Sequence, residues 1–186
     1  PLPRPDPPRI PGDGTADIPD RGAVNTMVQK VASPLGEVDI LVNNAAVLAN
    51  HALFLETDPA GCEREIRVIL HGTMHCSRAV LPGMIERGGG RIVNIATDAA
   101  RVGQEREVSY SAAKGGVIAF TKSLAKEAGR HNVNVNVISP GATNSPMRIG
   151  LQEDLRKKLG DEAWRARKAK VMRLYPLRRI GEMEDI

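Results

Sequence analysis

Apolar side chains follow two alternating patterns along this chain. Short apolar runs, typical of buried parallel strands, occur at 38–42, 91–96 and 133–138. Between and before them lie stretches in which apolar residues recur every three or four positions, at about 20–34, 59–87 and 108–129. This alternation predicts an α/β protein with a doubly wound parallel sheet, right-handed crossovers and helices on both faces.

Two segments depart from this alternation. Residues 1–15 are so rich in proline and glycine that we expect a disordered arm ahead of a domain at 16–186. Residues 148–172 have the pattern of a mobile amphipathic helical segment. Inside the long helical stretch, Pro82 predicts a kink or a local break, because proline lacks the N–H that a helix needs.

Small and polar residues follow each predicted strand at its carboxyl end. Asn43 to Ala46 follow the first strand, Thr97 follows the second, and Pro140 to Ser145 follow the third. Ligands of open parallel sheets bind at this edge. The three segments therefore predict one shared ligand site.

Tyr110 and Lys114 are the residues that indicate chemistry most directly. Being four apart in a predicted helix, they share one face. A phenol titrates near pH ~10, and an ammonium about 4 Å away supplies on the order of 4 kcal/mol at an effective dielectric near 20. We therefore expect Lys114 to lower the pKa of Tyr110 so that the phenol acts as an acid or base, with the Thr97 hydroxyl on the substrate oxygen. The alternatives are an ordinary surface pair, and a Thr97 that bonds its own backbone.

These motifs, in this order, resemble those of a short-chain dehydrogenase/reductase over residues from about 16 to 186. Asn43 to Ala46 resembles the family's Asn-Asn-Ala-Gly, and Thr97, Tyr110 and Lys114 match its catalytic serine, tyrosine and lysine. The resemblance implies a Rossmann-like oxidoreductase in which Tyr110 exchanges the hydroxyl proton, Thr97 holds the oxygen and Lys114 also bonds the nicotinamide ribose.

The resemblance also implies a cofactor, NAD or NADP, and the residues that bind it. Asp17 and Ile18 match the pair that contacts the adenine, and the turn at Pro140 matches the one that holds the nicotinamide carboxamide. The full implied set is Asp17, Ile18, Asn44, Ala45, Ala46, Tyr110, Lys114, Pro140, Gly141, Thr143 and Ser145.

Substrate and partners follow from the same resemblance. Residues 95–103 resemble members that oxidise hydroxyacyl-coenzyme A thioesters, and oxoacyl-carrier-protein reductases are nearly as similar. We therefore expect a small molecule or an acyl thioester as substrate, beneath a lid at about 147–175. The family typically pairs the helices equivalent to 59–87 and 108–129 between subunits, which implies a homo-dimer or homo-tetramer.

The sequence departs from the family pattern in three ways. The glycine-rich turn that cradles the pyrophosphate is missing, so we expect a piece of a longer protein that binds cofactor weakly or not at all. Threonine replaces the catalytic serine at Thr97, which keeps the hydroxyl. Ile69 stands where the family usually has the asparagine of a proton relay. These departures leave open a second class of function, a non-catalytic fragment that acts only as a structural or interaction module.

Composition narrows the remaining possibilities. The net charge of +4 and a pI near 9.3 invite a nucleic-acid interpretation, but aromatic residues make up only 3% of the chain and supply no stacking platform. No apolar stretch approaches the ~18 residues of a membrane span, and we expect a cytoplasmic protein. His71 and His75 have the spacing of helix-borne metal ligands but lack a third ligand, so we expect no metal site.

Overall fold

The structure, a computed structural model that describes residues 16–186, contains a parallel sheet in the order β1-β2-β3. The strands are β1 (Ile40–Asn43), β2 (Gly90–Ile95) and β3 (Val133–Ile138). The α-helices are α1 (Arg21–Leu35), α2 (Pro59–Ile66), α3 (Gly72–Glu86), α4 (Ala99–Val102), α5 (Val108–Ala128), α6 (Pro146–Leu159) and α7 (Asp161–Met172). The predicted parallel α/β fold is confirmed, and residues 1–15, the expected arm, lie outside the described part of the chain.

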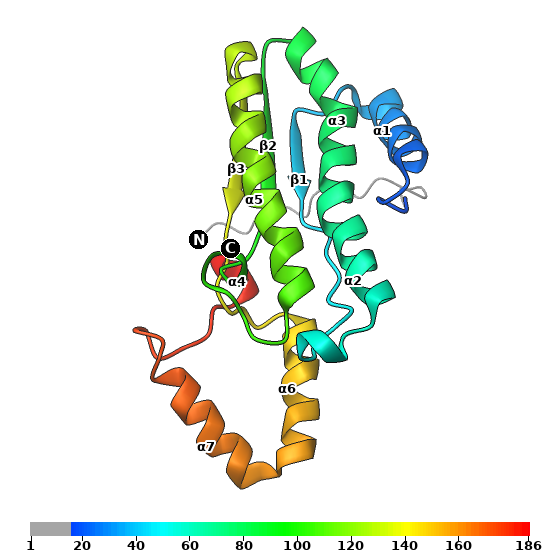
Figure 1. Ribbon diagram of the computed structural model, residues 1–186. Helices are drawn as coiled ribbons and strands as arrows, with labels where there is room; N and C mark the ends of the chain where they lie inside the picture. Colours follow the sequence, from blue (N-terminus) through cyan, green and yellow to red (C-terminus); the bar gives the residue numbers. More distant parts are fainter. Residues whose placement is uncertain (1–15) are drawn as a thin grey trace.

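The long helices lie on one face of the sheet. Figure 1 shows α3 and α5 side by side in front of the strands, with α1 beside α3. The core between sheet and helices contains Met84 from α3, Ile92 from β2 and Val133 from β3, all at most 2% exposed. Burying these side chains supplies roughly 1.5–3 kcal/mol each toward folding.

The opposite face of the sheet carries no helix within residues 16–186, although the sequence predicted helices on both faces. In the register of the strands, Ile40 and Val42 of β1 and Ile138 at the end of β3 point to this face. They are 57%, 56% and 40% exposed. The apolar runs therefore identified the strands correctly, but only one side of each strand is buried by the residues that the structure describes.

The long helical stretch is interrupted at a different place from the one predicted. A π-helical segment, η2 (Arg67–His71), separates α2 from α3, whereas Pro82 lies inside α3 without breaking it. A local break at Pro82 is therefore not found, and the alternative of a kink there stays a prediction. Within η2 the carbonyl of Ile69 accepts a hydrogen bond from the Thr73 hydroxyl at 2.7 Å, which partners the carbonyl where the helical spacing changes.

The segment 148–172, predicted to be helical and amphipathic, forms two helices. Gly160 separates α6 from α7 with φ of +78°, a conformation that favours glycine. Across this turn the Arg156 guanidinium donates two hydrogen bonds to Asp161, at 2.6 and 3.0 Å, and lies 5.4 Å from the Trp164 ring centroid. Together α6 and α7 project from the body as a V (Figure 1). Among the helices that the structure describes, none combines the length with the apolarity that a membrane crossing requires.

Candidate active site

A buried chain of polar side chains ties the strand ends to the helices. Asn43, the last residue of β1, donates to Asn94 of β2 at 2.8 Å and to the Ser77 hydroxyl of α3 at 3.2 Å. Asn94, fully buried, in turn donates to the Thr121 hydroxyl of α5 at 2.8 Å. Since unpaired buried amides cost free energy, this network fixes β1, β2, α3 and α5 at the edge where the predicted site residues begin.

Lys114 is held at the carboxyl end of β2. Its side chain is almost fully buried, and its ammonium donates a hydrogen bond to the Ile95 carbonyl at 2.5 Å. Burial lowers the pKa of Lys114 to about 8. The amine therefore points to the strand edge rather than to solvent, as a ligand-binding role requires.

Tyr110 lies on the same face of α5 as Lys114, as the four-residue spacing predicted. The Lys114 amine is 6.0 Å from the centroid of the Tyr110 ring. The expected lowering of the phenol's pKa is not found in the chain on its own. Burial raises the pKa of Tyr110, and the nearby carboxylates of Glu107 and Glu65 raise it further. The phenol is thus neutral at physiological pH and suited to donate a proton.

Thr97 follows β2 two residues after Ile95, the residue that holds the Lys114 amine. Its hydroxyl accepts a hydrogen bond from the Ala99 amide at 3.3 Å, at the start of α4. This is the local backbone bond that sequence reasoning held open as an alternative. The hydroxyl hydrogen remains available for a substrate oxygen.

The residues predicted to contact the adenosine side of a cofactor lie in two places. Asn44, Ala45 and Ala46 are exposed in the loop after β1. Exposed Asp17 and the neighbouring Ile18 precede α1; the Ile18 side chain packs on Gly72, and its carbonyl lies 3.2 Å from the His75 ring nitrogen. A Cβ at position 72 would come within 2.7 Å of Ile18, so the glycine permits this contact.

The turn after β3 borders a cavity of about 350 Å³. Pro140, Gly141 and Thr143 line it together with Tyr175 and Gly181, and the turn pairs with Gly181 through a bridge at Thr143. The turn's last predicted ligand, Ser145, caps the start of α6 instead, because its hydroxyl accepts the Arg148 amide at 3.3 Å.

Ile69, at the position of the family's relay asparagine, is packed in an apolar cluster. It is 1% exposed and contacts Ala113 and Val117 of α5, on either side of Lys114. Its side chain offers no hydrogen bond. Any proton path from Lys114 must therefore use other groups.

Sequence reasoning missed Glu65, a fully buried carboxylate in the last turn of α2. It accepts hydrogen bonds from the backbone amides of Ala49 and Asn50 and from the Ser109 hydroxyl, next to Tyr110. One signal was available: Glu65 lies four residues before buried Ile69, so the two share a helix face that packs inward. A charged residue at such a position indicates a specific partner.

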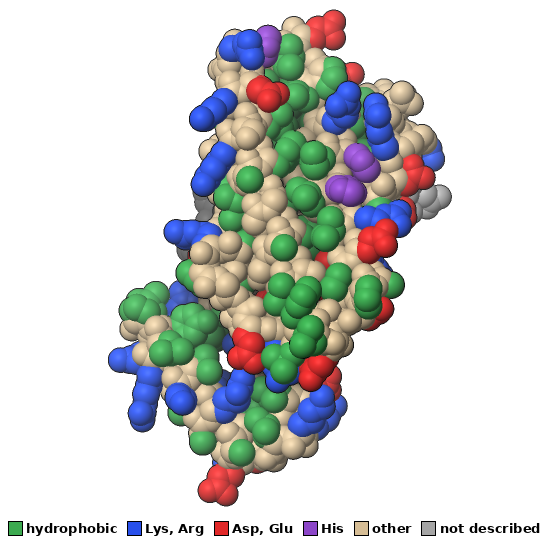
Figure 2. Space-filling model, viewed as in Figure 1, with side chains coloured by type: hydrophobic (Ala, Val, Ile, Leu, Met, Phe, Trp, Pro, Cys, Tyr) green, Lys and Arg blue, Asp and Glu red, His purple; other side chains and the backbone are tan. Residues whose placement is uncertain are grey.

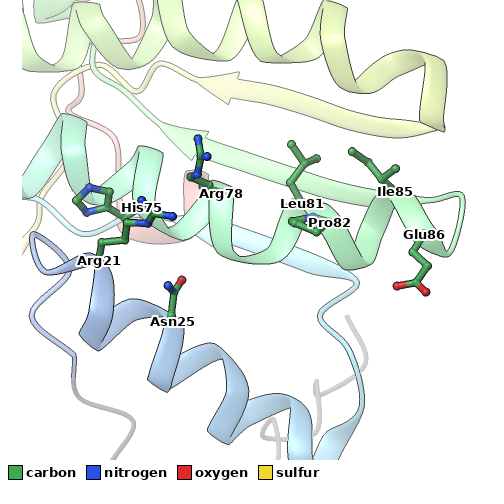
Figure 3. A pocket seen from close by; sticks show the side chains of 8 residues that line it. All are labelled: Arg21, Asn25, His75, Arg78, Leu81, Pro82, Ile85 and Glu86. Carbon is green, nitrogen blue, oxygen red and sulfur yellow. The ribbon is translucent and has the colours of Figure 1, made fainter.

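A larger groove than the cavity at the turn after β3 lies elsewhere, between α1 and α3. It has a volume of about 670 Å³; Arg21 and His75 line one end and Ile85 and Glu86 the other (Figure 3). None of the residues predicted to act in catalysis lines it. The candidate site is therefore the strand edge at β1, β2 and β3, and not this groove.

Comparison with known families identifies the class. The family model described as short chain dehydrogenase matches residues 14–156. The chain belongs to the short-chain dehydrogenase family, which agrees with its Rossmann-like sheet and with Tyr110 and Lys114 on one face of α5.

Curated relatives are similar over nearly the whole chain. Nodulation protein G of Azospirillum brasilense is 36% identical over 91% of this chain and 64% of its own length. The 3-oxoacyl-(acyl-carrier-protein) reductase FabG of Haemophilus influenzae is 32% identical over 91% of this chain and 65% of its own. Acetoacetyl-CoA reductase of Allochromatium vinosum is 33% identical over 92% of this chain and 65% of its own length. The chain thus spans slightly less than two thirds of each relative.

Solved structures of the same fold include oxidoreductases with bound cofactor. An NAD+-bound xylitol dehydrogenase superposes with a TM-score of 0.81 and 29% identity, covering 90% of this chain and 66% of that one. A levodione reductase superposes with a TM-score of 0.81 and 28% identity, covering 90% of this chain and 63% of that one. ElxO with NADP bound superposes with a TM-score of 0.77 and 25% identity, covering 89% of this chain and 63% of that one.

Proposed function

We propose that the protein containing this chain transfers a hydride between NAD or NADP and a hydroxyl or oxo group. The observation that carries this proposal is the buried Lys114 amine at the end of β2 with the Tyr110 phenol on the same helix face. Tyr110 gives its proton to the substrate oxygen in reduction and accepts it in oxidation, while Thr97 holds that oxygen. Lys114 would bond the nicotinamide ribose, and the cofactor would supply the hydride.

The described residues fit the nicotinamide end of such a cofactor better than its pyrophosphate. Lys114, Thr97 and the cavity-lining Thr143 offer polar groups at the strand edge. A glycine-rich phosphate turn is not among residues 16–186. We therefore expect residues 1–186 alone to bind NADH weakly. Titration by nicotinamide fluorescence tests this; micromolar binding by the isolated chain would contradict it.

For the substrate we propose an acyl thioester, of coenzyme A or of a carrier protein. The lid segment, residues 147–175, carries nine Lys and Arg against four Asp and Glu, whereas the whole chain has a net charge of +4. Figure 2 shows basic side chains gathered over α6 and α7. A positive rim accelerates the approach of a phosphate-bearing substrate.

Salt tests this substrate class. In the full-length enzyme, kcat/KM for acetoacetyl-CoA should fall several-fold between 20 and 300 mM salt, whereas kcat/KM for an uncharged diketone should change little, because salt screens long-range attraction. Equal salt dependence of the two substrates would exclude a steering role for the lid segment.

Subunit pairing through α2–α3 and α5 is the proposed assembly, as a homo-dimer or homo-tetramer. These helices carry exposed apolar side chains at Ile66, Met74 and Val108, and Figure 2 shows apolar surface running along this face. Sedimentation of the full-length protein tests the proposal: Met74→Glu should shift the oligomer toward monomer, and an unchanged sedimentation coefficient would contradict it.

The alternative function is a non-catalytic structural module, and one observation favours it. Ile69 replaces a polar relay position with a fully packed apolar side chain. The two candidate functions predict different turnover. A full-length protein that binds NADH but reduces no carbonyl substrate would be a structural module. A full-length protein whose turnover depends on Tyr110 would be an enzyme.

A further inference from the structure

Glu65 is a buried charge that the proposed proton and hydride transfers do not use. Its Oε1 accepts the amides of Ala49 at 2.7 Å and Asn50 at 3.0 Å, and its Oε2 accepts the Ser109 hydroxyl. Its exposed fraction is 0%. Three donors of this kind satisfy an ionised carboxylate, and hydrogen bonds to a charged acceptor are about twice as strong as neutral ones.

The three donors belong to two segments that meet at the active site. Ala49 and Asn50 lie in the loop that begins after β1 with Asn44, on the proposed cofactor side. Ser109 lies in the first turn of α5, directly before Tyr110. Glu65, from α2, is therefore the group through which the loop after β1 and the turn that bears the phenol are bonded together.

A second bond pattern strengthens the connection on the loop side. The Asn50 side chain accepts the Asp58 amide at 3.0 Å and donates to the Asp58 carbonyl at 3.1 Å, just before α2 begins. Since Glu65 lies in the last turn of α2, both ends of this helix thus bond to residues 49–50 of the loop. Rotation of α2 would break bonds at both ends.

We propose that Glu65 is a positioning residue, which fixes the loop after β1 to the first turn of α5 and places a negative charge near the Tyr110 phenol. This inference rests on the proposed function of Tyr110. Its geometric part concerns the ground-state structure, and it can be tested without cofactor, substrate or turnover.

The other charged groups around the phenol determine how large the effect is. Lys114 follows Tyr110 by one turn of α5, and Glu107 precedes that helix with His51 of the loop 4.0 Å from its carboxylate. At α4, Arg101 pairs with Asp98 at 3.1 Å and so contributes little net charge. Burial is the largest cause of the raised pKa of Tyr110, followed by Glu107 and then Glu65. Removing the Glu65 charge should therefore lower this pKa in part.

A single-tyrosine protein measures this directly. The chain has two tyrosines, so Tyr175→Phe leaves Tyr110 as the only phenol, whose ionisation is followed by phenolate absorbance. Adding Glu65→Gln keeps the size and one acceptor oxygen, replaces the other oxygen with an NH2 donor, and removes the charge. We expect the pKa of Tyr110 to fall by about half a unit or more. Glu63→Gln, an exposed acid on the same helix, is the matched control and should leave it unchanged. Equal pKa values in the two variants would overturn the electrostatic part.

Hydrogen exchange tests the positioning part in the same Tyr175→Phe protein, even if Glu65→Gln fails to fold. The amides of Ala49 and Asn50 should exchange at least tenfold more slowly than amides of the exposed loop residues 44–46. Ser109→Ala, which removes one donor and no charge, should accelerate exchange at Tyr110 and Ser111 while Ala49 stays protected. Unprotected amides at Ala49 and Asn50 would overturn the positioning role of Glu65. The turnover of Tyr110→Phe bears on the proposed function alone. A failure of the proposed function is therefore distinguishable from a failure of the positioning role of Glu65.

Discussion

At the residue scale, the electrostatic state of Tyr110 is determined by its burial and by the charged groups around it. The spacing of Tyr110 and Lys114 placed both on one face of α5, as found. It could not reveal that Glu65 also lies near the phenol, because this approach joins segments distant in sequence. Glu107, three residues before Tyr110, was visible in the sequence. A phenol near two carboxylates in a buried site stays neutral. In the chain on its own, Tyr110 is therefore a neutral phenol.

Lys114 gives a residue-scale prediction for stability against pH. Its folded pKa, about 8, lies below the unfolded value of 10.5. Below pH 8 both states hold the proton; from pH 8 toward 10.5 the unfolded state binds more protons, so this group raises the free energy of unfolding as pH increases. Urea titrations between pH 7.5 and 9.5 should show this rise relative to Lys114→Met. Lys122→Met, an exposed lysine on the same helix, is the control and should behave like the wild type.

At the element scale, apolar periodicity located strands and helices within a few residues but not their interruptions. The strand at 133–138 has the predicted limits. The break of the long helix lies at η2 rather than at Pro82, because π geometry arises from tertiary packing that periodicity does not encode. Gly160 was visible in the sequence, but its positive φ and the Arg156–Asp161 pair that brackets it were needed to separate α6 from α7.

Asn94 gives the element-scale prediction. It accepts from Asn43 and donates to Thr121, and so ties β1, β2 and α5 together in a fully buried position. Asn94→Ala should lower the free energy of unfolding by about 2–3 kcal/mol, because two buried partners lose a bond. Asn136→Ala, at an exposed position of β3, should change it by no more than about 0.5 kcal/mol. Denaturation in urea measures both; similar losses would mean that the buried network is not what joins the strands to α5.

At the scale of the whole molecule, the described residues form a one-sided sheet. The family match and the parallel strand order agree with the sequence prediction. The uncovered face of the sheet was not predicted, because a strand buried on both sides and a strand buried on one side have similar apolar runs in sequence. Ile40, Val42 and Ile138 therefore form an exposed apolar surface on the isolated chain.

This surface gives the prediction at the largest scale. The isolated chain should bind an apolar dye such as anilinonaphthalene sulfonate, with a fluorescence increase that Val42→Lys reduces at least twofold. Leu174→Lys, which changes a side chain that is exposed but outside the sheet, is the control. Dye binding that is the same in both variants would place the apolar surface elsewhere.

The most direct measurement of the proposed chemistry is the turnover of the full-length protein with Tyr110→Phe, compared with that of the wild type. Loss of the phenol hydroxyl at position 110 should lower kcat by about 10²- to 10⁴-fold, because it removes the group that exchanges the proton. The protein's melting temperature should change little. A Tyr110→Phe enzyme that keeps most of its activity would contradict the proton-transfer role of Tyr110 and with it the proposed function.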